Sequence, residues 1–201
     1  MNRLVILLIT IILYACSAPN KKSPEESNGK GGYTSHTDDS SKETKADKKP
    51  KSPRTASMAM IGGNHVHIDY SSPSMRGRKI FGGLVGYGQV WVTGAHKATN
   101  ITFNNDVIIE ATTILKGKYG LFTIPGETQW TIIINKDWDM HLADDYDEAN
   151  DVVRLVVDVE ELESAVEALT FEVTATDDTY GNVTIMWENT SVSFEVKNVV
   201  N

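Results

Sequence analysis

The 201-residue chain has little cysteine, no long apolar segment and no excess of basic charge. Its one cysteine, Cys16, excludes an intramolecular disulfide. The apolar run from Leu4 to Leu13 is too short to span a bilayer as a helix. The net charge of -8 argues against a nucleic-acid partner, because such proteins carry a clustered basic face. A composition with 40% hydrophobic and 23% charged residues is typical of a soluble globular protein.

The amino terminus has the layout of a bacterial export signal. Arg3 gives a short positive start, the apolar run follows, and the run ends at Leu13-Tyr14-Ala15-Cys16. An aliphatic residue, then a small residue, then cysteine resembles the lipobox of bacterial lipoproteins. The resemblance implies that residues 1–15 are removed as a signal peptide and that Cys16 is lipidated, which anchors the protein to a membrane of the cell envelope. The alternative is an ordinary signal peptide followed by an incidental thiol.

Residues 17–52 contain almost no side chains that could form a core. Lysine, serine, acids, glycine and proline dominate, and the only appreciable apolar side chains are Ala18, Tyr33 and Ala46. Such a segment cannot bury enough apolar surface to offset the entropy of ordering it. We therefore expect residues 16–52 to be the lipidated cysteine and a disordered tether. Residues 53–201 are expected to form one extracytoplasmic domain, in which 10 basic and 21 acidic side chains leave a net charge of about -11.

After Pro53 the sequence changes to short runs of β-branched and aromatic residues with a period of two. Residues 54–61 and 64–71 flank Gly62-Gly63, a pair that suits a tight hairpin turn. The other expected strands are 101–103, 107–109, 119–124, 129–135, 152–159, 170–176, 182–188 and 191–197. Residues 74–84 and 160–168 have some helical character, but the first contains glycines and the second is short. The pattern predicts an all-β fold, an antiparallel β-sandwich or jelly-roll-like single domain.

The tryptophans divide into two groups by their surroundings. Trp91, Trp130 and Trp187 lie within strand patterns, so we expect them in the core. Trp138 stands among acidic residues and is expected to be exposed. The side chains expected to face the core near the carboxyl terminus are Phe171, Val173, Val183, Ile185, Trp187, Val192, Phe194 and Val196.

A series of motifs runs through the predicted domain. It includes Ile68-Asp69-Tyr70-Ser71-Ser72-Pro73-Ser74, Gly77-Arg78-Lys79-Ile80-Phe81-Gly82-Gly83-Leu84-Val85, Trp91-Val92-Thr93-Gly94-Ala95, Leu121-Phe122-Thr123-Ile124-Pro125-Gly126, Asp151-Val152-Val153-Arg154 and Trp187-Glu188. Together these motifs resemble an uncharacterised bacterial family catalogued as domain of unknown function 2911, over roughly residues 52–196. The resemblance implies a β-rich fold and an exported, often lipid-anchored protein. It implies no established activity.

The chain departs from the family pattern mainly around residues 91–95. The departures are Ser72, Gly86, Gln89, Val92, His96 and Lys97, where the family has arginine, proline, lysine, arginine, asparagine and glutamate. A site shared by the family would therefore be remodelled here. Arg78 and Arg154 match the pattern and are candidate ligand-binding residues, and Trp138 is a third candidate because of its expected exposure. The alternative is that both arginines cap loops and pair with acids.

Two sets of residues could hold a metal ion. His65, His67 and Asp69 alternate along one predicted strand and so project from one face, and two imidazoles with a carboxylate suit zinc. His96 or His141 would have to complete that site, and an ordinary half-exposed strand also explains the pattern. The second set has the spacing of a calcium loop and consists of Asp137, Asp139, His141, Asp145 and Glu148. Leu142 replaces the required glycine, which leaves an irregular calcium site or a solvated acidic surface.

No recognisable nucleophile, base or phosphate-loop spacing accompanies these residues. The sequence therefore predicts a lipid-anchored envelope protein, without a cofactor, that binds a ligand or a protein partner. A metal-dependent hydrolase or isomerase using the His-x-His-x-Asp face is the alternative from another class. A purely structural scaffold is a third.

Overall fold

The computed structural model describes residues 51–199, which form ten β-strands and one turn of 3-10 helix. The elements are β1 (Arg54–Ile61), β2 (Asn64–Ser71), β3 (Asn100–Phe103), β4 (Val107–Ile109), β5 (Thr112–Ile114), β6 (Gly117–Ile124), β7 (Gln129–Asn135), η1 (Glu148–Asn150), β8 (Asp151–Asp158), β9 (Glu160–Ala175) and β10 (Tyr180–Asn198). The predicted signal peptide, Cys16 and the predicted tether up to residue 50 lie outside the described residues. Residues 51–199 contain no helix long and apolar enough to cross a membrane.

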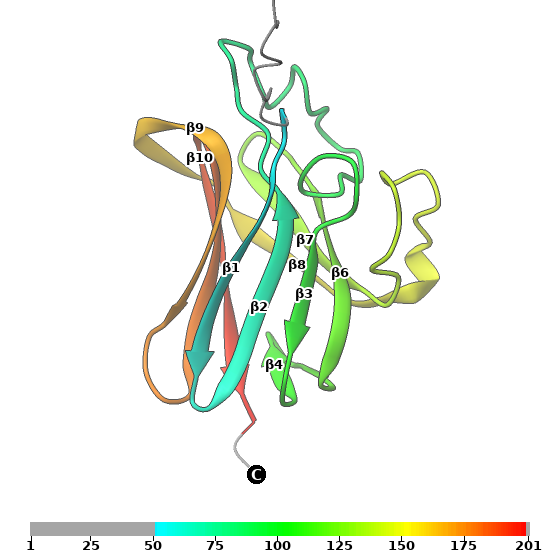
Figure 1. Ribbon diagram of the computed structural model, residues 1–201, viewed down its shortest axis with the longest axis vertical. Helices are drawn as coiled ribbons and strands as arrows, with labels where there is room; N and C mark the ends of the chain where they lie inside the picture. The colour runs from blue at the N-terminus through cyan, green and yellow to red at the C-terminus, as the bar shows by residue number, and fades with distance from the viewer. Residues whose placement is uncertain (1–50, 200–201) are drawn as a thin grey trace, which may run out of the picture. The chain divides into compact units, whose positions relative to one another are not determined.

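The strands form two antiparallel sheets that pack face to face, as the sequence predicts. One sheet has six strands in the order β1-β2-β3-β6-β7-β8, and the other has four in the order β5-β4-β10-β9. Figure 1 shows the long β9–β10 hairpin facing the six-stranded sheet, with β1 beside β9 at one margin. At that margin the backbone amide of Val173 donates a hydrogen bond to Ser57 Oγ at 3.1 Å. The margin is therefore closed by contacts between the two sheets.

The β1–β2 hairpin confirms the sequence prediction in both bounds and turn. Gly62 and Gly63 adopt φ of 54° and 81°, the left-handed backbone that a two-residue hairpin turn requires. The turn places Ile61 opposite Asn64 and fixes the register of both strands. We call this end of the sandwich the turn end. The opposite end, where β2 leads into residues 72–99, is called the loop end.

The main core lies between the sheets and takes its side chains from both of them. The eight side chains predicted to face inward from residues 171–196, among them Trp187, are all buried, and so is Trp130. Trp91 is only partly buried and packs against the margin of this core. A second apolar cluster lies on the outer face of the six-stranded sheet. It consists of Val92, Ala98, Phe122 and Ile133, and residues of the β7–β8 loop cover it.

Long-range pairing, more than local composition, decides several segments. Residues 160–168 form the first half of β9, in which Glu160, Glu161 and Val166 pair with β10, and residues 74–84 contain no helix. The two strands expected at 182–188 and 191–197 are one strand, β10, interrupted by irregular register around Glu188. Residues 104–106 join β3 of the six-stranded sheet to β4 of the four-stranded sheet.

Candidate functional site

The loop end is dominated by residues 72–99, which connect β2 to β3. Both sheets hold this long connection in place. The backbone groups of Trp91 and Thr123 exchange two hydrogen bonds, at 2.8 and 3.0 Å, which fix the loop to β6. The amide of Met75 donates to the carbonyl of Glu167 at 2.8 Å, which fixes it to β9. The loop is therefore an ordered part of the domain that bridges the two sheets.

An aromatic cluster supports the loop from below. The rings of Trp91 and Trp187 stack with centroids 6.0 Å apart and planes inclined by 18°. The ring of Phe81 meets Trp91, Trp130 and Trp187 edge-on, in the arrangement that aromatic quadrupoles favour. Trp91 Nε1 donates to the Gly94 carbonyl at 3.0 Å, so the indole is fixed at the point where the core reaches the surface.

A cavity of about 400 Å³ opens above the stacked indoles. Its lining is mainly apolar and consists of Pro73, Leu84, Val85, Gly86, Gln89, Val90, Trp91, Gly94, Ala95, His96, Leu142 and Trp187. The Leu84 side chain is 51% exposed and that of Leu142 is 41% exposed, although both are large and apolar. An apolar cavity of this size with a few polar groups is typical of a small-molecule site.

A second cavity, of about 500 Å³, adjoins the first. The two share Pro73, Leu84, Ala95 and His96, and the second adds Lys51, Ser52, Arg76 and Arg78. We call the two cavities together the loop groove. One half of the loop groove is apolar and the other is basic, in a domain whose net charge is strongly negative.

The two arginines of the loop groove differ in how they are held. The guanidinium of Arg78 donates to the carbonyls of Met75 and Ser74 at 2.9 and 2.8 Å, so it caps its own turn. The backbone amide of Arg76 donates to Glu167 Oε1 at 2.9 Å, while its side chain reaches only the Lys51 carbonyl at 3.5 Å. Within residues 51–199 neither guanidinium forms an ion pair with a carboxylate. Both positive charges therefore stay available to an anion.

Backbone strain is concentrated around the loop groove. Among the described residues, six other than glycine have positive φ, and Glu110 is the one in a turn elsewhere. The remaining five are Arg76, Thr93, His96, Leu142 and Glu188, with φ between 51° and 66°. Thr93 is the least suited because it is β-branched, and a hydrogen bond of 2.8 Å from Thr99 Oγ1 to its carbonyl holds it. Strain that packing maintains in this way is characteristic of binding and catalytic sites.

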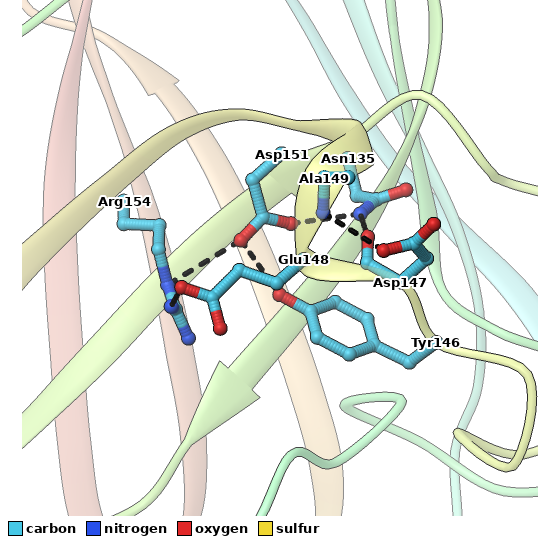
Figure 2. A network of polar contacts seen from close by, with 7 residues as sticks. All are labelled: Asn135, Tyr146, Asp147, Glu148, Ala149, Asp151 and Arg154. Atoms are coloured by element: carbon cyan, nitrogen blue, oxygen red, sulfur yellow. Dashed lines mark hydrogen bonds and ion pairs between the residues drawn. The ribbon is translucent and has the colours of Figure 1, made fainter.

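Residues 136–150, which we call the cover loop, supply Leu142 to the loop groove. Figure 2 shows the polar network that fixes this loop between β7 and β8. The side-chain amide of the buried Asn135 donates to the Asp147 carbonyl at 3.0 Å and to Asp151 Oδ1 at 2.7 Å. The amide of Leu142 donates to the His96 carbonyl at 2.8 Å. The cover loop and residues 72–99 therefore form one wall.

Tyr146 is the aromatic anchor of the cover loop. Its ring packs against Phe122 with centroids 5.3 Å apart, and its hydroxyl donates to Asp151 Oδ2 at 2.6 Å. Burial, with the hydrogen bond and the negative charge of Asp151, raises the pKa of the Tyr146 phenol well above its usual value. The phenol thus stays protonated at neutral pH and keeps its hydrogen bond to Asp151.

The three residues predicted to bind a ligand do not form one site. Arg78 lines the basic half of the loop groove. Arg154 instead belongs to the network of Figure 2, where it pairs with Glu148 and lies 3.4 Å from Asp151 Oδ2. Trp138 is exposed as predicted and has Lys118 Nζ 4.3 Å above its ring, in a separate acidic depression. Of the three, only Arg78 therefore lines the loop groove.

The arrangement of the His-x-His-x-Asp face does not favour the zinc site of the alternative hypothesis. His65, His67 and Asp69 do project from the same side of β2, but His67 Nε2 pairs with Asp69 Oδ1 at 3.2 Å. His96 and His141 lie 6.3 Å apart, ring to ring, with His96 at the loop groove. Nowhere in the described part of the chain do three histidine, cysteine, aspartate or glutamate side chains gather to hold a metal. A metal-dependent enzyme on this face is therefore not favoured.

Three of the four carboxylates of the notional calcium loop have other partners. Asp137 accepts a hydrogen bond from Asn150 Nδ2 at 2.7 Å, Asp139 lies 3.4 Å from Lys97 Nζ, and Glu148 pairs with Arg154. Leu142, at the position of the loop glycine, does adopt positive φ. The backbone therefore turns tightly at Leu142, but in the described residues the carboxylates do not converge on one point where an ion could bind.

Sequence reasoning missed the loop groove because its residues looked like core. Trp91 and Trp187 lie in strand-like patterns, and only the tertiary structure shows that both reach the cavity. One signal was present. Of the positions where the chain departs from the family pattern, Gly86, Gln89 and His96 line the loop groove.

The comparisons with known proteins give one match. The family model described as "Protein of unknown function (DUF2911)" matches residues 52–196, which covers almost all of the described sandwich. No curated protein and no solved structure matches the chain. The match includes both β-sheets and every residue of the loop groove except Lys51, so the chain belongs to the DUF2911 family.

Proposed function

We propose that this protein is a lipid-anchored envelope protein whose β-sandwich binds an amphipathic anion in the loop groove. The observation that carries the binding proposal is the continuity of an apolar cavity with a basic one through Pro73, Leu84, Ala95 and His96. A ligand with an apolar body and a carboxylate or similar anionic end matches both halves.

The two halves contribute different parts of the binding free energy. Apolar surface placed against Leu84, Trp91 and Leu142 leaves water, which contributes about 25 cal/mol for each Å² buried. The anionic end meets Arg76 and Lys51, where charge-assisted hydrogen bonds add orientation. The exposed Leu84 and Leu142 support this proposal, because large apolar side chains exposed at the rim of a cavity are typical of a surface that a ligand covers.

The polar groups of the loop groove favour binding over catalysis. His96 is the one imidazole in the loop groove. Its ring lies 6.3 Å from the His141 ring, and no carboxylate in residues 51–199 pairs with it, whereas a general base or an activated nucleophile needs an acid to orient the imidazole. The proposed function is therefore capture of a ligand without chemical change.

The charge of the basic half provides a direct test of binding. Quenching of tryptophan fluorescence in the full chain by laurate, with dodecanol as the uncharged analogue, measures both affinities. Replacing Lys51 and Arg76 together by glutamine should weaken laurate binding by about tenfold or more, roughly 1.4 kcal/mol, and leave dodecanol binding unchanged.

Arg54→Gln is the matched control, because Arg54 is basic and exposed but lines neither cavity. It should change neither affinity. Equal weakening of laurate and dodecanol, or saturable binding of neither, would contradict the proposal.

The anchoring part of the proposal rests on the sequence around Cys16 alone. In a bacterial host the Cys16→Ala protein should be released from the membrane fraction or stay unprocessed, since the chain has no other thiol to lipidate. A mutant that is still processed and firmly membrane-bound would overturn the anchoring and leave the binding proposal intact.

A further inference from the structure

The outer face of β1 and β2 carries two methionines and two histidines. On β1, Ala59 packs against the core and Ser57 bonds to β9, so Met58 and Met60 project outward. Their side chains are 51% and 55% exposed, which is unusual for methionine. On β2, Val66 and Ile68 are buried in the core, so His65 and His67 project from the same outer face. The face is separate from the loop groove.

The hairpin register brings the four side chains together in two directly opposed pairs. Met58 lies opposite His67, and Met60 lies opposite His65. Directly opposed residues of antiparallel strands have Cβ atoms about 4.5–5.5 Å apart. The imidazole centroids of His65 and His67 are 5.6 Å apart. Because the methionine side chain has three rotatable bonds, each sulfur can reach the space beside an imidazole.

Asp69 adds a feature typical of metal-binding histidines. Its Oδ1 lies 3.2 Å from His67 Nε2, and its Oδ2 lies 4.0 Å from Lys118 Nζ. A carboxylate at one ring nitrogen fixes the imidazole and leaves the other nitrogen, Nδ1, to bind a metal. Asp69 is thus a positioning residue for His67.

We propose that this face binds Cu(I), with Met58, Met60, His65 and His67 as ligands. Thioethers are soft ligands that select monovalent copper, and imidazoles also suit it, whereas zinc and calcium gain little from methionine sulfur. The proposal differs from the zinc hypothesis in its ligands, since methionine completes a set that histidine and aspartate leave incomplete. It is also independent of the amphipathic anion in the loop groove.

The test uses the full chain with Cys16→Ser, which removes the only thiol. Cu(I), kept reduced by ascorbate without oxygen, is titrated in competition with bicinchoninate. One ion should bind per chain. Replacing Met58 and Met60 together by leucine should weaken Cu(I) binding by about 100-fold or more, because removing a metal ligand lowers affinity more than removing a residue that only positions a ligand.

Leucine has nearly the volume of methionine, so a thermal melt of the double variant should match that of the parent. Met140→Leu is the matched control, since Met140 packs on the other apolar cluster. It should leave Cu(I) affinity unchanged. Asp69→Asn should weaken binding by about tenfold, as a positioning residue does.

Methionine oxidation gives a second readout. Ag(I), a soft ion that is not oxidised, should slow the conversion of Met58 and Met60 to sulfoxide by peroxide and leave Met140 unaffected. Absence of Cu(I) binding overturns the proposal, and so does a Cu(I) affinity that survives Met58→Leu with Met60→Leu. Zn(II) binding stronger than Cu(I) binding, with loss only on replacing the histidines, overturns it too.

Discussion

The two ends of the sandwich differ in which residues adopt positive φ. At the turn end Gly62 and Gly63 adopt it, and the buried Asn64 secures the neighbouring turn by accepting hydrogen bonds from the amides of Asn104 and Asn105 at 2.9 Å each. These residue types suit the backbone they form.

At the loop end Gly77, Gly82 and Gly88 also adopt positive φ, but so do residues that disfavour this backbone region. Thr93 and Leu142 are held there by hydrogen bonds from Thr99 Oγ1 and to the His96 carbonyl. The comparison shows that the residues of the turn end favour the backbone conformation they adopt, whereas Thr93 and Leu142 at the loop end are held in a conformation that they disfavour. The loop groove lies where that strain is stored.

The turn end should react most strongly to an added methyl group. In Gly62→Ala the new Cβ would lie 1.8 Å from the Asp178 carbonyl oxygen, in a left-handed backbone. We expect a loss of about 3 kcal/mol or more in the free energy of unfolding. Gly63→Ala meets no atom within 4 Å and should cost only about 1–2 kcal/mol. Urea denaturation measures both, and equal losses would show that conformation alone governs this turn.

The loop end should depend on pH through Tyr146. Tyr146→Phe removes the hydrogen bond to Asp151 and should lower the free energy of unfolding by about 1.5 kcal/mol at pH 7. The folded-state pKa is raised, so this contribution is complete below the unfolded pKa of about 10 and declines as pH rises above it. Urea denaturation from pH 7 to 11.5 should show the gap between wild type and variant closing. A gap that stays constant to pH 11.5 would contradict this assignment.

Relief of strain should separate stability from binding at the loop end. His96→Gly should raise the free energy of unfolding by about 0.5–1 kcal/mol, because glycine accepts a φ of 66°. It should also weaken laurate binding by about fivefold, or roughly 1 kcal/mol, since His96 lines both cavities. Lys97→Gly, at ordinary φ, should instead destabilise by about 0.4–1 kcal/mol. A destabilised His96→Gly protein would show that the strain is not real.

Exposed leucines at the two ends should differ in their effect on laurate binding but not in their effect on stability. Leu84 at the loop groove and Leu115 before β6 are 51% and 64% exposed. Replacing either by serine should change the free energy of unfolding by less than about 0.5 kcal/mol. Leu84→Ser should weaken laurate binding by about tenfold, and Leu115→Ser should not, as fluorescence titration will measure. Equal affinities in the two variants would place the apolar part of the ligand elsewhere.

Much of the fold could be predicted because the strands follow the period-two pattern. β1, β2 and β7 have the predicted bounds, and the eight inward side chains of β9 and β10 are buried as expected. The errors lie where composition and pairing disagree. Residues 160–168 have helical composition, yet they form strand because Glu160, Glu161 and Val166 pair with β10 and Ala168 bridges Ser74.

The candidate site was less predictable for a physical reason. Arg78 lines the loop groove and Trp138 is exposed, while Arg154 pairs with Glu148 and Asp151, and the sequence does not predict the apolar half of the loop groove. A tryptophan in a strand pattern gives the same signal whether it ends in the core or at the rim of a cavity. Leu142 reaches the groove only because the cover loop folds back over the six-stranded sheet.

The sequence by itself determined the β-sandwich class, the β1–β2 hairpin and the family, because alternation, a Gly-Gly turn and local motifs are properties of neighbouring residues. Only the tertiary structure decided the loop groove and the face shared by Met58, Met60, His65 and His67. Both are made by side chains from different segments, and their meeting depends on register and on long-range packing, which no single segment encodes.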